Sequence, residues 1–172
     1  ELDLLAKPFN CTTGYRLAYP YLEFKIFSEH ETDFIKLSAL AEVTLAPYLI
    51  SDGVQTASEM LKSFLTHQET TIQIADHATG GILESVLKTP FNHSYLNFNH
   101  EIATTDSPTF LINGLTEYWQ QETNCTQTEV TLDYFFRDKH ETFKRGVPFR
   151  GDRIKRFAAE WICYQIKNIL HH

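Results

Sequence analysis

The fold class follows first from a strand–turn–helix pattern at residues 70–87. Residues 70–75 (TTIQIA) form a short apolar run of the kind found in buried strands. The small-residue turn 76–81 (DHATGG) follows, and residues 82–87 (ILESVL) carry apolar side chains at helical spacing. A strand that passes through such a turn directly into a helix is the basic unit of an α/β fold.

The alternation continues through the rest of the chain. We predict a helix over 57–65, with Thr56 and Glu59 at the spacing of a capping box. We also predict a weaker strand within 94–103, a helix over 107–121 that begins with Ser107 and Pro108, a strand over 128–136 and a last helix from about Asp152. This order predicts a layered α/β/α domain over residues 53–172.

The first 52 residues read as a separate, smaller unit. Residues 14–27 (GYRLAYPYLEFKIF) alternate apolar and polar positions as a half-buried strand does, with Pro20 at a bend. Residues 31–49 repeat apolar side chains at helical spacing, and Pro47 closes that helix. We therefore predict a small α+β segment over 1–52, with the boundary near Gly53.

Composition narrows the class of protein. The chain has 172 residues, 42% of them hydrophobic, and its formal net charge is −7. It has no transmembrane-length apolar run and no signal peptide, and its three cysteines are widely spaced. We predict a cytoplasmic protein with reduced thiols, no membrane association and chance N-x-S/T triplets at Asn10, Asn92 and Asn124. Because the chain starts at Glu1 rather than Met, we expect a fragment of a longer protein.

The basic residues are unevenly distributed. Eight of the fifteen Lys and Arg residues lie between Arg137 and Arg156, where only three acidic residues occur. This cluster has two interpretations, a solvated basic face or a site for an anionic ligand. The overall negative charge argues against nucleic-acid binding across the whole surface.

Two motifs resemble the CinA family. Residues 71–90 (TIQIADHATGGILESVLKTP) are similar to the signature of the family's C-terminal domain, a strand followed by A-E-S-C-T-G-G and a helix. Residues 149–170 (FRGDRIKRFAAEWICYQIKNIL) are similar to its last element, an aromatic residue, G-D-R and a helix. Residues 14–27 and 47–53 resemble the small KH-type module that precedes this domain in full-length CinA proteins.

The resemblance implies an amidohydrolase that releases ammonia from nicotinamide mononucleotide. In the family a serine of the signature is the nucleophile, a lysine and a tyrosine activate it, and a C-terminal arginine binds substrate. Here Thr79, Gly80 and Gly81 are kept, Asp76 replaces the glutamate, and His77 stands at the serine position. No lysine occurs between Lys88 and Lys139, the tyrosine position falls near Ala103, and the family's later glycine-rich loop has no counterpart.

The candidate site residues follow from these matches. The turn residues Thr79, Gly80 and Gly81 are expected to hold a phosphate, because a Gly-rich turn that opens a helix favours anions. The arginines Arg150, Arg153 and Arg156 are expected to assist, since a mononucleotide phosphate suits guanidinium groups. We predict no cofactor and no metal; His77, His93 and His100 have no standard metal-ligand spacing.

His77 has three interpretations: a structural histidine, a ligand-binding residue without chemistry, or a general base paired with Asp76 or another carboxylate. The hypothesis that best fits the losses is a catalytically silent CinA-like domain that binds a pyridine mononucleotide or serves in assembly. One alternative is an active amidohydrolase that uses His77. Another is nucleic-acid binding by the KH-like segment, although residues 14–53 contain no G-x-x-G loop.

The resemblance also implies partners. These domains self-associate in the family, so we expect a homo-oligomer. Full-length family members carry an N-terminal pyrophosphatase-like domain, which would precede this chain in the complete protein.

Overall fold

The structure is a computed structural model that describes residues 2–51, 55–68, 71–99, 106–122, 124–148 and 151–171. The chain divides into two compact units, Glu1–Gly53 and Val54–His172. Each unit is described below by itself.

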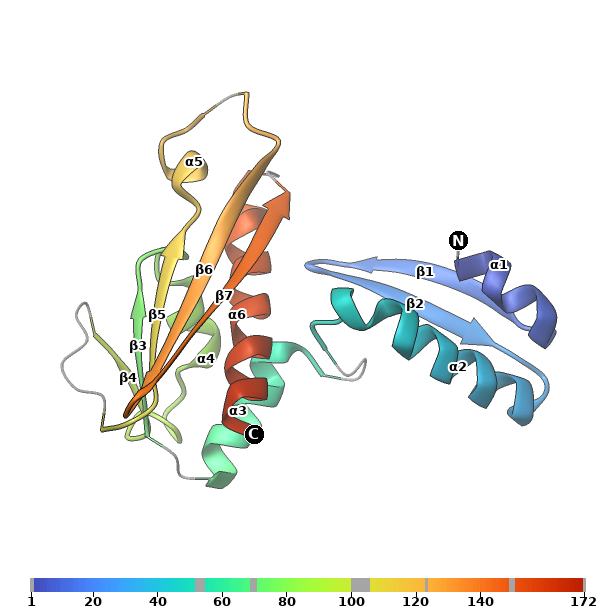
Figure 1. Ribbon diagram of the computed structural model, residues 1–172, viewed down its shortest axis with the longest axis horizontal. Helices are drawn as coiled ribbons and strands as arrows, with labels where there is room; N and C mark the ends of the chain where they lie inside the picture. The colour runs from blue at the N-terminus through green and yellow to red at the C-terminus, as the bar shows by residue number, and fades with distance from the viewer. Residues whose placement is uncertain are drawn as a thin grey trace. The chain divides into compact units, whose positions relative to one another are not determined.

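Unit 1 combines a β-hairpin with helices. Strands β1 (Thr12–Ala18) and β2 (Tyr21–Phe27) pair antiparallel, and a cis Tyr19–Pro20 bond lies in the turn between them (Figure 1). Helix α1 (Leu2–Ala6) and the 3₁₀ turn η1 (Lys7–Phe9) precede the hairpin; helix α2 (Glu31–Leu45) and the 3₁₀ turn η2 (Ala46–Tyr48) follow it. The sequence predicted one strand here, whereas the structure has a two-stranded hairpin.

Unit 2 is built on a mixed five-stranded sheet with the order β4-β3-β5-β6-β7. Strand β3 (Ile72–Asp76) runs parallel to β4 (Leu96–Phe98) and β5 (Thr109–Gly114). Strand β6 (Gln127–Phe136) is antiparallel to both β5 and β7 (Lys139–Pro148). The helices are α3 (Ala57–Gln68), α4 (Ile82–Leu87), the short α5 (Thr116–Trp119) and α6 (Arg153–His171).

The core lies between one face of this sheet and a single layer of helices. Helices α3, α4 and α6 contact one another, and Figure 1 shows them grouped beside the sheet. On the helix side Ile74 pairs with Phe110 in register, and Ile112 pairs with Leu132; all four side chains are buried. Phe143, opposite Leu132, lines a groove together with α6, so α6 lies on this face.

The opposite face differs from the expected α/β/α arrangement. Leu111 and Asp133 are partly exposed there, and Thr142, which pairs with Asp133, is exposed. Within the described ranges no long helix packs on this face, so the domain has two layers rather than the three that the sequence suggested. The physical reason lies in β6 and β7, an antiparallel pair whose polar alternation lets one face meet water.

The predicted helix over 107–121 is wrong. Residues 109–114 form β5, a central strand between β3 and β6, and only Thr116–Trp119 are helical. Phe110 and Ile112 alternate into the core, and the Pro108 carbonyl accepts a hydrogen bond from the Gln73 N–H at 2.9 Å. Burial on both sides by neighbouring strands overrides the helix-like spacing of the later residues.

Strand β7 was not predicted. Its sequence, KHETFKRGVP, was interpreted only as part of a basic face. As the edge strand beside β6 it carries charges that pair on the sheet surface, such as Lys144 Nζ with Glu129 Oε1 at 3.3 Å. Charged edge strands of this kind discourage pairing with other chains.

The first turn of α3 confirms the capping box. The Thr56 N–H donates to Glu59 Oε2 at 2.8 Å, and the Glu59 N–H donates to Thr56 Oγ1 at 3.2 Å. These reciprocal bonds satisfy two donors that a helix start leaves unpaired.

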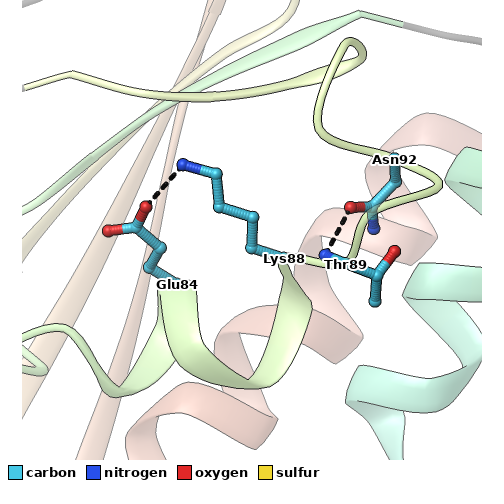
Figure 2. Close-up of polar contacts among 4 residues, drawn as sticks. All are labelled: Glu84, Lys88, Thr89 and Asn92. Atoms are coloured by element: carbon cyan, nitrogen blue, oxygen red, sulfur yellow. Dashed lines mark hydrogen bonds and ion pairs between the residues drawn. The ribbon is translucent and has the colours of Figure 1, made fainter.

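The end of α4 is fixed by the buried side chain of Asn92 (Figure 2). Its Oδ1 accepts from the Thr89 N–H at 2.8 Å, and its Nδ2 donates to the Leu87 carbonyl at 2.8 Å. On the outer side of the same helix, Lys88 pairs with Glu84 at 2.7 Å. Because Asn92 is 0% exposed, the triplet that begins there has a structural use and its amide is closed to modification in the folded state.

No helix among the described residues has the length and apolar character that crossing a membrane requires.

Candidate functional site

The turn after β3 is held together by Asp76. Its Oδ1 accepts hydrogen bonds from the backbone N–H groups of Ala78 at 3.0 Å and Thr79 at 2.9 Å, and its Oδ2 accepts one from the Thr79 hydroxyl. The Thr79 Oγ1 in turn accepts from the Leu83 N–H at 3.0 Å, which ties the turn to α4. Asp76 therefore acts as the carboxylate of an Asx-type turn, and three donors already occupy it.

His77 lies on the outside of this turn. Its backbone N–H donates to the Ile112 carbonyl at 2.9 Å, which anchors the turn to β5. The imidazole is exposed and makes no hydrogen bond or ion pair with any residue that the structure describes. Asp76 points its carboxylate into the turn and not at this ring. The geometry thus lacks the oriented base–carboxylate pair that general-base catalysis by histidine uses.

Trp119 covers the glycine part of the turn. Its indole N–H donates to the Ala78 carbonyl at 2.8 Å, and its six-membered ring lies against Gly80. Gly80 has φ +63° and Gly81 has φ +85°, so both glycines adopt the left-handed conformation that other residues avoid. A Cβ on Gly80 would lie 2.7 Å from the Trp119 ring, whereas one on Gly81 would meet nothing within 4 Å.

The first turn of α6 joins the same cluster through Lys155. Its Nζ lies 5.4 Å from the centroid of the Tyr118 ring, 5.6 Å from that of the Trp119 ring and 3.6 Å from Asp152 Oδ1. The Tyr118 hydroxyl donates to Asp152 Oδ1 and lowers the pKa of that carboxyl. A hydrogen bond with Tyr118 also raises the pKa of Lys155, so the amine stays charged at neutral pH.

The sequence-predicted residues are partly brought together. The turn with Thr79, Gly80 and Gly81 meets the start of α6 through Trp119 and Lys155. Arg153 and Arg156 are exposed on the first turns of α6, and Arg156 has no partner among the residues described. Thr79 is fully buried, so its hydroxyl faces the turn and not solvent. Arg150 lies outside the described residues.

The three histidines considered for a metal have different surroundings. His77 is exposed, His93 Nδ1 lies 2.8 Å from the Pro90 carbonyl oxygen, and His100 lies outside the described residues. The described part of the chain contains no group of three or more His, Cys, Asp or Glu side chains placed to hold a metal ion.

Sequence reasoning missed Tyr118, Trp119, Asp152 and Lys155 as neighbours of the turn. The error followed from the predicted helix over 107–121, which placed Tyr118 and Trp119 on a core-facing stripe. Trp119 is instead 47% exposed, while the second tryptophan, Trp161, is buried in α6. A signal was present in the short spacing between the end of β5 and the pair Tyr118–Trp119, which brings aromatic side chains to the same sheet edge as the turn.

Comparison with known proteins gives sequence relatives of one kind. No family model matches the chain. The chain is 25% identical over 121 residues to a CinA-like protein of Shewanella sediminis, an alignment that covers 69% of this chain and 25% of that protein. It is 28% identical over 107 residues to a CinA-like protein of Shewanella baltica, covering 60% and 25% of the two chains. The chain thus spans about a quarter of the length of these curated relatives.

A solved structure is similar at lower identity. The competence damage-inducible protein A of Klebsiella pneumoniae aligns at 15% sequence identity and a TM-score of 0.48, covering 69% of this chain and 99% of that one. The class defined by the structure itself is a mixed α/β domain with a loop-to-helix turn at the end of a central strand. The sequence similarities support the CinA family for this chain.

Proposed function

We propose that this chain is a CinA-like protein, or a segment of one, whose amidohydrolase-type domain is catalytically silent and binds a nucleotide. The observation that carries the proposal is the state of Asp76. Its carboxylate is committed to three donors of its own turn, and so it activates neither His77 nor a water molecule.

The neighbouring groups support the same conclusion. The only hydroxyl within the turn, that of Thr79, is fully buried and bonded to Asp76. The lysine that packs beside the turn is Lys155, and its raised pKa keeps the amine protonated. A lysine activates a hydroxyl only in its neutral form, so Lys155 provides charge and not a base.

The same arrangement suits binding of an anion. Lys155 is a charged amine set among Tyr118 and Trp119, and Arg153 and Arg156 extend from the adjoining helical turns. We assign Arg156 to the phosphate of a mononucleotide, because it is exposed and makes no ion pair with the described residues. Gly81, with open space above it, allows close approach of a ligand to the backbone.

The test is calorimetric titration of the chain with nicotinamide mononucleotide, with ammonia followed in the same sample. We expect binding without ammonia release. Arg156→Ala should weaken binding about tenfold, because a guanidinium–phosphate contact is worth on the order of 1–2 kcal/mol. Lys144→Ala serves as the control, since Lys144 pairs with Glu129 on the sheet surface and should bind as the parent chain does.

Two results would overturn the proposal. Release of ammonia that disappears in His77→Ala would make the domain an active amidohydrolase with an unorthodox histidine. Absence of any heat of binding up to millimolar ligand would remove the nucleotide from the function.

A further inference from the structure

The outer face of α2 is an apolar stripe without a partner in the described structure. The side chains of Leu37 and Ala41 are buried on the inner face of the helix. On the opposite side, Ile35 is 57% exposed and Val43 is 76% exposed, with the exposed Ala39 midway between them. These three residues recur at i, i+4 and i+8, so they form one line along the helix, here called the outer stripe.

Unit 1 as a whole has more apolar surface than it buries. Twelve of the fourteen large apolar side chains that are exposed in the described residues belong to this unit, including all of the outer stripe's large residues. Its buried apolar side chains are Ala6, Leu37, Ala41 and Ile50. A domain of about 50 residues with so small a core is marginal by itself and is commonly stabilised by association.

The charges beside the outer stripe indicate which partner fits. Lys36 and Glu42 flank it on opposite sides, three residues before and three residues after Ala39. Both side chains are exposed, and neither has an ion pair or hydrogen bond with any described residue. Six residues apart on one helix, they do not reach each other.

A second copy of the chain complements this arrangement. A two-fold axis that passes over Ala39 relates each position before it to the matching position after it on the partner. When the two helices cross steeply, Lys36 of each copy meets Glu42 of the other, and the small Ala39 lets the backbones approach. Ile35 and Val43 are then covered from both sides. Helix crossings of this kind pack side-chain ridges into grooves.

We infer that two copies of this chain associate through α2, with Ala39 at the crossing point and two reciprocal Lys36–Glu42 ion pairs. The charge of unit 1 argues against the other apolar partners of such a stripe. With eight acidic and four basic residues in 1–53, it repels anionic lipid headgroups and nucleic acid. This association concerns unit 1 alone and does not depend on what unit 2 binds.

The test measures the dimer dissociation constant of the full chain by sedimentation equilibrium at low salt. Lys36→Glu and Glu42→Lys, each alone, should raise it about tenfold or more, because each places like charges at both contacts. The double variant K36E/E42K should return it close to the parent value. An equimolar mixture of the two single variants should form a heterodimer, since both of its contacts then join opposite charges.

The control exchanges a pair that lies within one copy. Glu84 and Lys88 bond to each other on α4 (Figure 2), and E84K/K88E should leave association unchanged. A second variant, Val43→Glu, should weaken association without changing the circular dichroism of the chain, since Val43 is solvent-exposed in the single copy. A chain that stays monomeric to millimolar concentration, or a dimer that ignores both single charge reversals, would overturn the inference. Binding to neutral lipid vesicles that Val43→Glu abolishes would assign the stripe to a membrane instead.

Discussion

Glu160 of α6 accepts two hydrogen bonds from Ser58, one from its backbone N–H and one from its hydroxyl, each at 2.9 Å. The two residues are 102 positions apart, and both side chains are buried. Ser58 lies in the first turn of α3, where backbone N–H groups have no partner within the helix. The last helix of the chain thus caps the first helix of unit 2, and the positive end of that helix faces a carboxylate.

This contact predicts that Glu160→Ala destabilises unit 2 by about 3 kcal/mol. Two donors would be left buried and unpaired, and bonds to a charged group are worth about 1.5–3 kcal/mol. Urea unfolding followed by circular dichroism measures the change. Ser58→Ala removes only the hydroxyl and keeps the backbone bond, so it should cost less. Equal losses in the two variants would show that the backbone bond contributes little.

Gly80 and Gly81 form a matched pair for the turn. Both have a positive φ, so Gly80→Ala and Gly81→Ala should each cost about 1–2 kcal/mol of backbone strain. Gly80→Ala should cost more, because its Cβ would lie 2.7 Å from the Trp119 ring. In a Trp119→Ala background that difference should vanish, as a double-mutant cycle of unfolding free energies would show. A difference that persists there would mean that the ring does not rest on Gly80.

The sequence predicted well those elements whose signals are local. The final helix has its apolar residues on one face, the capping box at Thr56 and Glu59 forms as expected, and β6 alternates as its sequence indicates. Residues 109–114 failed because their strand character depends on β3 and β6, which are distant in the chain. Tertiary pairing decides such segments, and local spacing does not.

The candidate site divides in the same way. The turn at 76–81 could be found from its glycines, since the need for positive φ is a local property of the backbone. The role of Asp76 could not, because a carboxylate that faces its own turn and one that faces a substrate have the same sequence. The neighbours Trp119 and Lys155 come from β5–α5 and α6, so they required the sheet order.

The capping box predicts a pH dependence of stability. Hydrogen bonds from the Thr56 N–H and hydroxyl hold the pKa of the Glu59 carboxyl below its usual value. A carboxyl with a lower pKa in the folded state stabilises fully above its unfolded value of about 4.3, and that stabilisation is lost as pH falls through the folded pKa. Glu59→Gln should therefore lower the melting temperature at pH 7 and have little effect near pH 2. A constant difference across this range would mean that the bonds do not depend on the charge.

The three cysteines predict a graded reaction with thiol reagents. Cys163 is fully buried in α6, and burial raises the pKa of its thiol well above the usual value. Cys11 and Cys125 are partly exposed. Since the thiolate is the reactive form, two thiols should react with an aromatic disulfide at pH 8 in the native chain, and the third only on unfolding. The Cys163→Ala variant should lose the slow phase alone. Fast reaction of all three thiols in the native state would show that α6 opens readily from the sheet.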